Sequence, residues 1–119
     1  MSDTATIYHN PRCSKSRSAL EYLERNHGQV VTIEYLKNPP DKQTLLAILE
    51  ELQLTPRQLM RQGDASYKDL NLGDDALTDD QLIDAIVEHP ILLERPIVRF
   101  NGDSAIARSL DKVIELLDE

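Results

Sequence analysis

A short apolar segment, a proline-containing turn and a helical pattern follow one another near the start of the chain, and together they restrict its fold most strongly. The apolar run covers residues 5–8, Asn10-Pro11 marks a turn, and helical spacing of apolar residues begins at Ala19. Proline keeps the residue before it out of the helical region, so the helix begins only after the turn. We therefore predict a strand, a loop and a helix, with Cys13 at the helix N-terminus.

The middle of the chain predicts a second strand and then a group of helices. Residues 29–36 alternate and are rich in β-branched side chains, which is typical of a strand. A helix of about three turns joins it to the first strand, so the two strands are expected to be parallel. Asp41, Thr55 and Thr78 each begin a helical pattern, the last two in capping boxes. The short helix after Thr55 is expected to end near Arg61. We expect these helices to form an insertion at about residues 41–90.

A hairpin and a final helix complete the predicted fold. Residues 96–100 and 104–107 predict strands, and Asn101-Gly102 between them is the strongest short hairpin signal in the sequence. Ser109 caps a last amphipathic helix. The predicted class is α/β, with a four-stranded mixed sheet in the order β-α-β, helical insertion, β-β-α. A chain of 119 residues is long enough for one domain with its own core, so we predict a single domain over residues 1–119.

The composition argues against several classes of protein. A net charge of −8 disfavours non-specific nucleic-acid binding, and the longest apolar runs are too short to span a membrane. No apolar signal sequence follows Met1, and one cysteine cannot form an intramolecular disulfide. We therefore expect a cytoplasmic protein. We also expect a monomer without nucleic-acid or membrane partners.

The surroundings of Cys13 indicate a reactive thiol. The first N–H groups of a helix lack backbone partners and carry partial positive charge, which stabilises a thiolate and also binds oxyanions. Arg12, Lys15 and Arg17 add positive charge, and no acidic residue occurs from residue 4 to residue 20. This combination favours nucleophilic chemistry on an anionic substrate. The alternative is that Cys13 is a buried small hydrophobe, as single cysteines often are.

Three arginines in separate segments are candidate ligands for the anion: Arg61, Arg95 and Arg108. Arginine is usually a solvated surface residue, so these three are functional only if they converge on Cys13, and spacing alone does not decide that. Pro96 follows Arg95 at the start of a predicted strand. It is either an ordinary entry proline or a cis-proline that holds a loop beside the cysteine.

The histidines and Ser16 indicate which cofactors and which kind of redox cycle are expected at Cys13. His9 lies four residues before Cys13 and either tunes the thiolate or makes a loop-capping hydrogen bond. One cysteine and three scattered histidines lack metal-ligand spacing, and no glycine-rich phosphate loop is present, so we expect neither a metal nor a bound cofactor. Dithiol oxidoreductases carry C-x-x-C, but the second position here is Ser16. A redox cycle at Cys13 therefore needs a thiol from another molecule.

A set of short motifs extends over nearly the whole chain in a characteristic order. They are Ile7-Tyr8-His9-Asn10-Pro11-x-Cys13, Ser16-Arg17, Tyr35-Leu36-x-Asn38-Pro39-Pro40, Leu59-Met60-Arg61, Thr78-Asp79-Asp80-Gln81-Leu82-Ile83, His89-Pro90-Ile91-Leu92 and Arg95-Pro96-Ile97-Val98. In these motifs the chain resembles the glutaredoxin-coupled arsenate reductases, and in its length it resembles the short branch of that family.

The resemblance implies a thioredoxin-like fold with a helical insertion and a nucleophilic Cys13. It implies that His9 assists thiolate formation and that Ser16 stabilises the thiolate. It also implies a cis-proline at Pro96 and three arginines that hold the oxyanion, namely Arg61, Arg95 and Arg108. One departure is Ser109, which stands where the resistance enzymes of the family have a proline.

The reaction implied by the resemblance is the reduction of arsenate to arsenite through a cysteine thioarsenate intermediate, a step in arsenic detoxification. Glutathione as co-substrate and glutaredoxin as partner would supply the two electrons. Two other functions stay open. One is a non-enzymatic, redox-responsive regulator of the same superfamily that binds RNA polymerase, although such regulators usually carry C-x-x-C. The other is a thiol-dependent reductase of another oxyanion or of a mixed disulfide.

Overall fold

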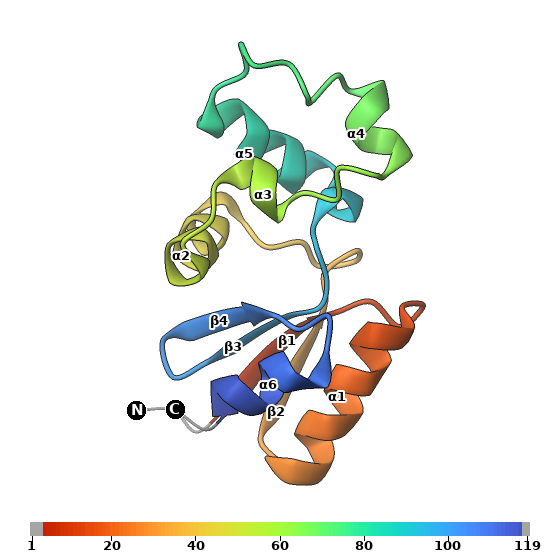
Figure 1. The fold of residues 1–119 in the computed structure, drawn as a ribbon, viewed down its shortest axis with the longest axis vertical. Coiled ribbons are helices and arrows are strands. Elements are labelled where there is room, and N and C mark those ends of the chain that lie inside the picture. Colours follow the sequence, from red (N-terminus) through yellow and green to blue (C-terminus); the bar gives the residue numbers. More distant parts are fainter. Residues whose placement is uncertain (1–3, 118–119) are drawn as a thin grey trace. The chain divides into compact units, whose positions relative to one another are not determined.

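The computed structural model describes residues 4–117, and the chain divides into two compact units. The first unit combines the N-terminal part up to Asn38 with the C-terminal part from Arg95, and the second unit is Pro39–Glu94 (Figure 1). The second unit covers the stretch in which the helical insertion was expected. The expectation of a single domain over residues 1–119 stays a prediction.

The first unit contains a four-stranded mixed sheet, as the sequence predicted, and its strands lie in the order β2-β1-β3-β4. Strand β1 pairs in parallel with β2 and antiparallel with β3, which in turn pairs antiparallel with β4. The elements of this unit are β1 (Ala5–His9), α1 (Ser14–Asn26), β2 (Val30–Glu34), β3 (Ile97–Phe100), β4 (Asp103–Ile106) and α6 (Leu110–Leu117). The predicted α/β class is thereby confirmed.

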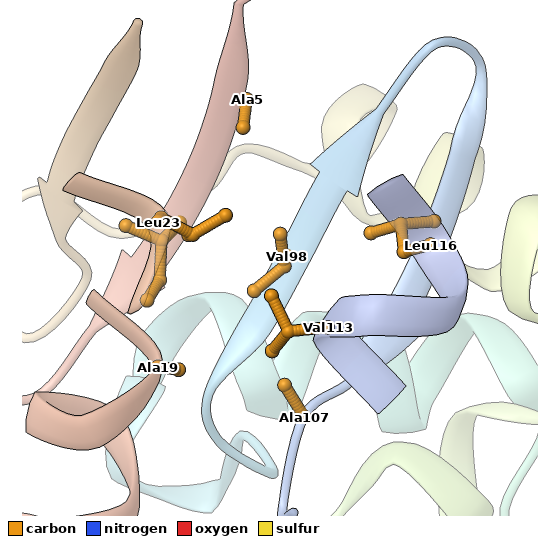
Figure 2. Packing of buried hydrophobic residues seen from close by; sticks show 8 residues of the cluster. Ala5, Ala19, Leu23, Val98, Ala107, Val113 and Leu116 are labelled. Carbon is orange, nitrogen blue, oxygen red and sulfur yellow. The ribbon is translucent and has the colours of Figure 1, made fainter. Parts of the chain in front are cut away.

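The core of this unit lies between the sheet and the two helices α1 and α6. Ile7 and Val98 are cross-strand partners on β1 and β3 and are both fully buried. Leu23 from α1 and Val113 from α6 belong to the same buried cluster. Figure 2 shows the side chains of Leu23, Val98 and Val113 directed toward one another from the helices and the sheet. Because each side chain excludes water from its neighbours, the cluster fixes α1, and with it the position of Cys13, against the sheet.

Two turns of the first unit use backbone conformations that favour glycine. Asn101 and Gly102 have φ of 54° and 82°, as the two central residues of a type I′ hairpin turn require, and they join β3 to β4 as predicted. Gly28 has φ of 85°, and its N–H donates to the carbonyl of Leu23 at 3.1 Å. The same carbonyl also accepts the His27 N–H at 2.8 Å, and together the two bonds end α1 and turn the chain toward β2.

The second unit is helical, and local capping signals start most of its helices. Asp41 accepts a hydrogen bond from the Thr44 N–H, and Thr55 and Thr78 both form complete capping boxes, so these three predictions are confirmed. The elements are α2 (Lys42–Leu52), α3 (Pro56–Leu59), α4 (Ala65–Asp69), α5 (Asp79–Glu88) and a single 3₁₀ turn, η1 (Pro90–Leu92). Their buried side chains include Leu45, Ile48, Leu82 and Ile86.

One boundary in the second unit differs from the prediction. The helix expected to end near Arg61 ends at Leu59, because Met60 leaves the helix and forms a β-bridge with Leu93. Two hydrogen bonds flank this bridge: Arg61 N–H donates to the Leu92 carbonyl at 2.7 Å, and Glu94 N–H donates to the Leu59 carbonyl at 2.8 Å. Partners about thirty residues away therefore end the helix. Among the described residues, no helix is long and apolar enough to cross a membrane.

Candidate active site

Cys13 lies at the N-terminus of α1, as predicted. It is the N-cap residue with extended backbone angles, φ −95° and ψ 122°, and its carbonyl accepts the Arg17 N–H at 3.0 Å as the helix begins. The preceding turn is closed by a hydrogen bond from the Cys13 N–H to the Asn10 carbonyl at 3.0 Å. The thiol is free and partly exposed, so the expectation of a fully buried structural cysteine is not met.

The protein lowers the pKa of the Cys13 thiol below its ordinary value. Burial alone raises this pKa, but three groups together outweigh it: the backbone N–H groups of Ser16 and Lys15 donate hydrogen bonds to the sulfur, and the guanidinium of Arg95 adds both a hydrogen bond and a positive charge. Each of these groups stabilises the thiolate and not the neutral thiol. The arrangement therefore favours a sulfur nucleophile near neutral pH.

The topology of the sheet explains how Arg95 reaches a cysteine 82 positions away in the sequence. Strand β3 runs antiparallel to β1, with Ile97 opposite Tyr8. Residues just before β3 therefore lie beside the loop that follows β1. The peptide bond between Arg95 and Pro96 is cis, as the second interpretation of this proline expected, while its role in holding a loop beside the cysteine stays a prediction.

His9 and Ser16 form a buried pair behind the loop. Ser16 is fully buried, and its hydroxyl lies 2.6 Å from Nδ1 of His9 and accepts the Asn10 N–H at 3.0 Å. The pKa of His9 lies below its ordinary value, first because burial disfavours the charged ring and also because Arg17 repels it. In this arrangement the Ser16 hydroxyl holds the loop between β1 and α1, while the backbone N–H of the same residue faces the thiolate.

Asn10 accepts two backbone hydrogen bonds within the loop, whereas the sequence indicated only that it marks a turn. Its side-chain oxygen accepts the Arg12 N–H at 3.0 Å, in the manner of an Asx-turn, and its backbone carbonyl accepts the Cys13 N–H. On the other side, Nη1 of Arg17 donates to the Pro11 carbonyl at 2.8 Å. The signal that predicts this role is the asparagine before proline at the head of a turn.

The other two predicted arginines lie in different parts of the chain. Arg108 follows β4, and it lines a pocket together with Ser14 and Lys15 from the first turn of α1. Arg61 belongs to the second unit, where Nη1 lies 3.6 Å from a carboxylate oxygen of Asp64. The roles of Arg61 and Arg108 in binding the anion stay predictions. Within residues 4–117, no group of three or more histidine, cysteine or acidic side chains is placed to hold a metal ion.

The fold and the site define a class: a thioredoxin-like α/β protein whose single cysteine has a lowered pKa at the N-terminus of the first helix. The model of the ArsC family matches residues 8–116, and the chain belongs to the ArsC family.

Curated relatives and solved structures agree with this assignment. The chain is 46% identical over 112 residues to a protein of Neisseria meningitidis named arsenate reductase, a match that covers 93% of this chain and 96% of the relative. It is 44% identical over 118 residues to the uncharacterised protein YfgD of Escherichia coli, covering 98% and 99%. A solved structure described as arsenate reductase from Vibrio cholerae has a TM-score of 0.91 and 43% identity, covering 95% of this chain and 97% of that one.

Proposed function

We propose that the protein is an arsenate reductase that uses glutathione and glutaredoxin as its reductants. One feature carries the proposal: Cys13 is the N-cap residue of α1, where the backbone N–H groups of Lys15 and Ser16 and the guanidinium of Arg95 lower the pKa of its thiol. Such a site provides a thiolate and, beside it, donors for the oxygens of an anion. The relatives named arsenate reductase give the substrate.

The first step is attack of the Cys13 thiolate on arsenic. A sulfur–arsenic bond forms, one oxygen of arsenate leaves as water after protonation, and arsenic remains As(V) in a cysteine thioarsenate. Negative charge on the remaining oxygens is stabilised by Arg95 and the loop amides, in the manner of an oxyanion hole. From the family resemblance, Arg61 and Arg108 bind the same oxygens.

The second step transfers two electrons to arsenic. Glutathione thiolate attacks the Cys13 sulfur, an S–S bond forms, and the electron pair of the broken sulfur–arsenic bond stays on arsenic, which leaves as arsenite, As(III). The thiol of glutaredoxin then attacks the glutathione sulfur of the mixed disulfide and releases the Cys13 thiolate. Two thiols from outside are needed because Ser16 occupies the position of a second cysteine. This requirement fits the reducing cytoplasm that we expect as its location.

A coupled assay tests the proposal. The protein is mixed with arsenate, glutathione, glutaredoxin, glutathione reductase and NADPH, and NADPH oxidation is followed by absorbance. We expect oxidation that requires arsenate, glutaredoxin and the protein together, with arsenite as the product. Cys13→Ser is expected to abolish it, because serine is not ionised at neutral pH and forms no disulfide.

The control separates chemistry from folding. Glu24→Gln changes an exposed side chain on the same helix, outside the residues around Cys13, and is expected to support the reaction, so that loss of activity in Cys13→Ser is not a general effect of altering α1. NADPH oxidation that is independent of arsenate, or that persists in Cys13→Ser, would contradict the proposed function.

A further inference from the structure

A pocket of about 210 Å³ lies beside the first turn of α1. It is lined by Ser14, Lys15 and Ser18 from α1, and by Arg108, Ser109 and Leu110 at the junction of β4 and α6. Ser14 is the residue next to Cys13, so the pocket lies one residue from the candidate nucleophile. Neither Cys13 nor Arg95 lines it. The pocket therefore borders the proposed arsenate site and shares Arg108 with it, while the sulfur that arsenic must contact lies outside its lining.

The chemistry of the pocket suits a carboxylate. The charged side chains that line it, Lys15 and Arg108, are both cationic, and the hydroxyls of Ser14, Ser18 and Ser109 supply further hydrogen-bond donors. Among residues 4–117, no acidic side chain lines it, although the chain as a whole carries a net charge of −8. Cationic donors beside hydroxyl groups form charge-assisted hydrogen bonds with carboxylate oxygens.

We propose that this pocket binds the glycine carboxylate of glutathione while the thiol of glutathione approaches Cys13. The inference rests on the proposed function, which needs an external thiol at this sulfur. In glutathione the glycine carboxylate follows the cysteine by one residue, and one extended residue spans about 3.5 Å, so the carboxylate must bind close to the reacting sulfur. Ser14 and Lys15, the two residues that follow Cys13, line the pocket, which places its cationic groups near the point where the glutathione thiol must react.

A thiol–disulfide exchange tests this binding without arsenate. Cys13 thiolate attacks glutathione disulfide, a bond forms between Cys13 and one glutathione, and the other glutathione leaves as its thiolate. The rate is measured by mass spectrometry for glutathione disulfide, for the disulfide of glutathione ethyl-esterified at glycine, and for the neutral hydroxyethyl disulfide. Dividing each rate by that for the neutral disulfide removes any change in the thiolate fraction of Cys13.

We expect Lys15→Gln to lower the normalised rate for glutathione disulfide about threefold to fivefold, as for loss of one exposed charge contact. The ester should react with the unaltered protein at least as slowly as glutathione disulfide does with Lys15→Gln, because it loses the contacts of both Lys15 and Arg108, and Lys15→Gln should not slow the ester further. Arg12→Gln is the matched control, because it removes a charge next to Cys13 on an exposed residue outside the pocket. A similar loss in Arg12→Gln, or none in Lys15→Gln, overturns the inference.

The coupled assay then shows whether the pocket binds the carboxylate of glutathione or the oxygens of arsenate. We expect Lys15→Gln to raise the KM for glutathione about threefold to fivefold and to raise the KM for arsenate less, because Arg12 and Arg17 remain beside Cys13. A rise in the KM for arsenate alone assigns the pocket to the oxyanion and overturns the inference. If no arsenate is reduced at all, the proposed function fails, and the exchange rates by themselves decide whether the pocket recognises glutathione.

Discussion

The contact between Arg95 and the Cys13 sulfur gives the sharpest prediction for a single residue. Arg95→Gln removes the positive charge and weakens the donor, so the pKa of Cys13 should rise, while the amides of Lys15 and Ser16 remain. Titration of thiolate absorbance measures this. In the unaltered protein the midpoint should lie below about 8.5, the value of an ordinary thiol, and in Arg95→Gln it should lie higher. An exposed arginine outside the site, Arg25, serves as control in Arg25→Gln.

The same shift in pKa sets the pH dependence of stability. Between the lowered pKa of the folded protein and the ordinary pKa of the unfolded chain, the unfolded chain binds more protons at Cys13. The free energy of unfolding, relative to Cys13→Ser, should therefore increase as pH rises through this window and then level off, with no contribution below it. Urea unfolding of both proteins over a pH series measures the difference. A difference that is constant with pH would contradict the lowered pKa.

Residue patterns predicted some parts of this site and missed others. The position of Cys13 at the helix N-terminus follows from Pro11 and the apolar spacing after it, which are local signals. The meeting of Cys13 with Arg95 depends on β3 lying beside β1, and that pairing is not encoded in the residues around either partner. The hydrogen bond between Ser16 and His9 likewise joins a helix to a strand. The residues around His9 therefore could not decide whether it tunes the thiolate or makes a hydrogen bond in the loop.

At the scale of elements, the hydroxyl of Ser16 joins α1 to the end of β1. Ser16→Ala leaves the ring of His9 and the Asn10 N–H without this partner, at an expected cost of about 1–3 kcal/mol in the free energy of unfolding. Urea denaturation measures it as a lower midpoint with an unchanged m-value. Ser18→Ala is the matched control, because it makes the same change at an exposed position of α1 and should stay within about 0.5 kcal/mol. Equal stabilities of the two variants would show that the hydroxyl does not hold the loop.

Elements that begin with local signals were predictable, and those that end through distant contacts were not. Asp41, Thr55 and Thr78 start helices through side-chain bonds to residues three positions on, so a short window of sequence contains the whole signal. The end of α3 depends instead on the bridge between Met60 and Leu93. Because that partner is far along the chain, helical pattern alone extended the helix by two residues.

At the scale of the whole molecule, the net charge of the protein is negative and repels the proposed anionic substrate, but the segment around Cys13 is positively charged. The chain has a net charge of −8, whereas the segment from residue 4 to residue 20 contains three cationic residues and no acidic one. At about 0.01 M salt the screening length is about 30 Å, so an approaching anion is repelled by acidic groups throughout the protein. At about 0.1 M it is about 10 Å, and the anion then interacts mainly with the cations beside Cys13.

This distribution predicts an unusual salt dependence for binding of arsenate. Between about 0.01 M and 0.1 M salt, long-range repulsion is removed while the local attraction persists, so the KM for arsenate should fall or stay constant. Toward about 1 M, where the screening length is about 3 Å, the local cations are screened as well and the KM should rise. Steady-state assays in sodium chloride and in sodium acetate measure this, with alkylation of Cys13 by neutral iodoacetamide as the control for the thiolate fraction. A KM that rises steadily from the lowest salt would mean that cations far from the loop attract the substrate. In that case the charge near Cys13 is not what brings the anion to the sulfur.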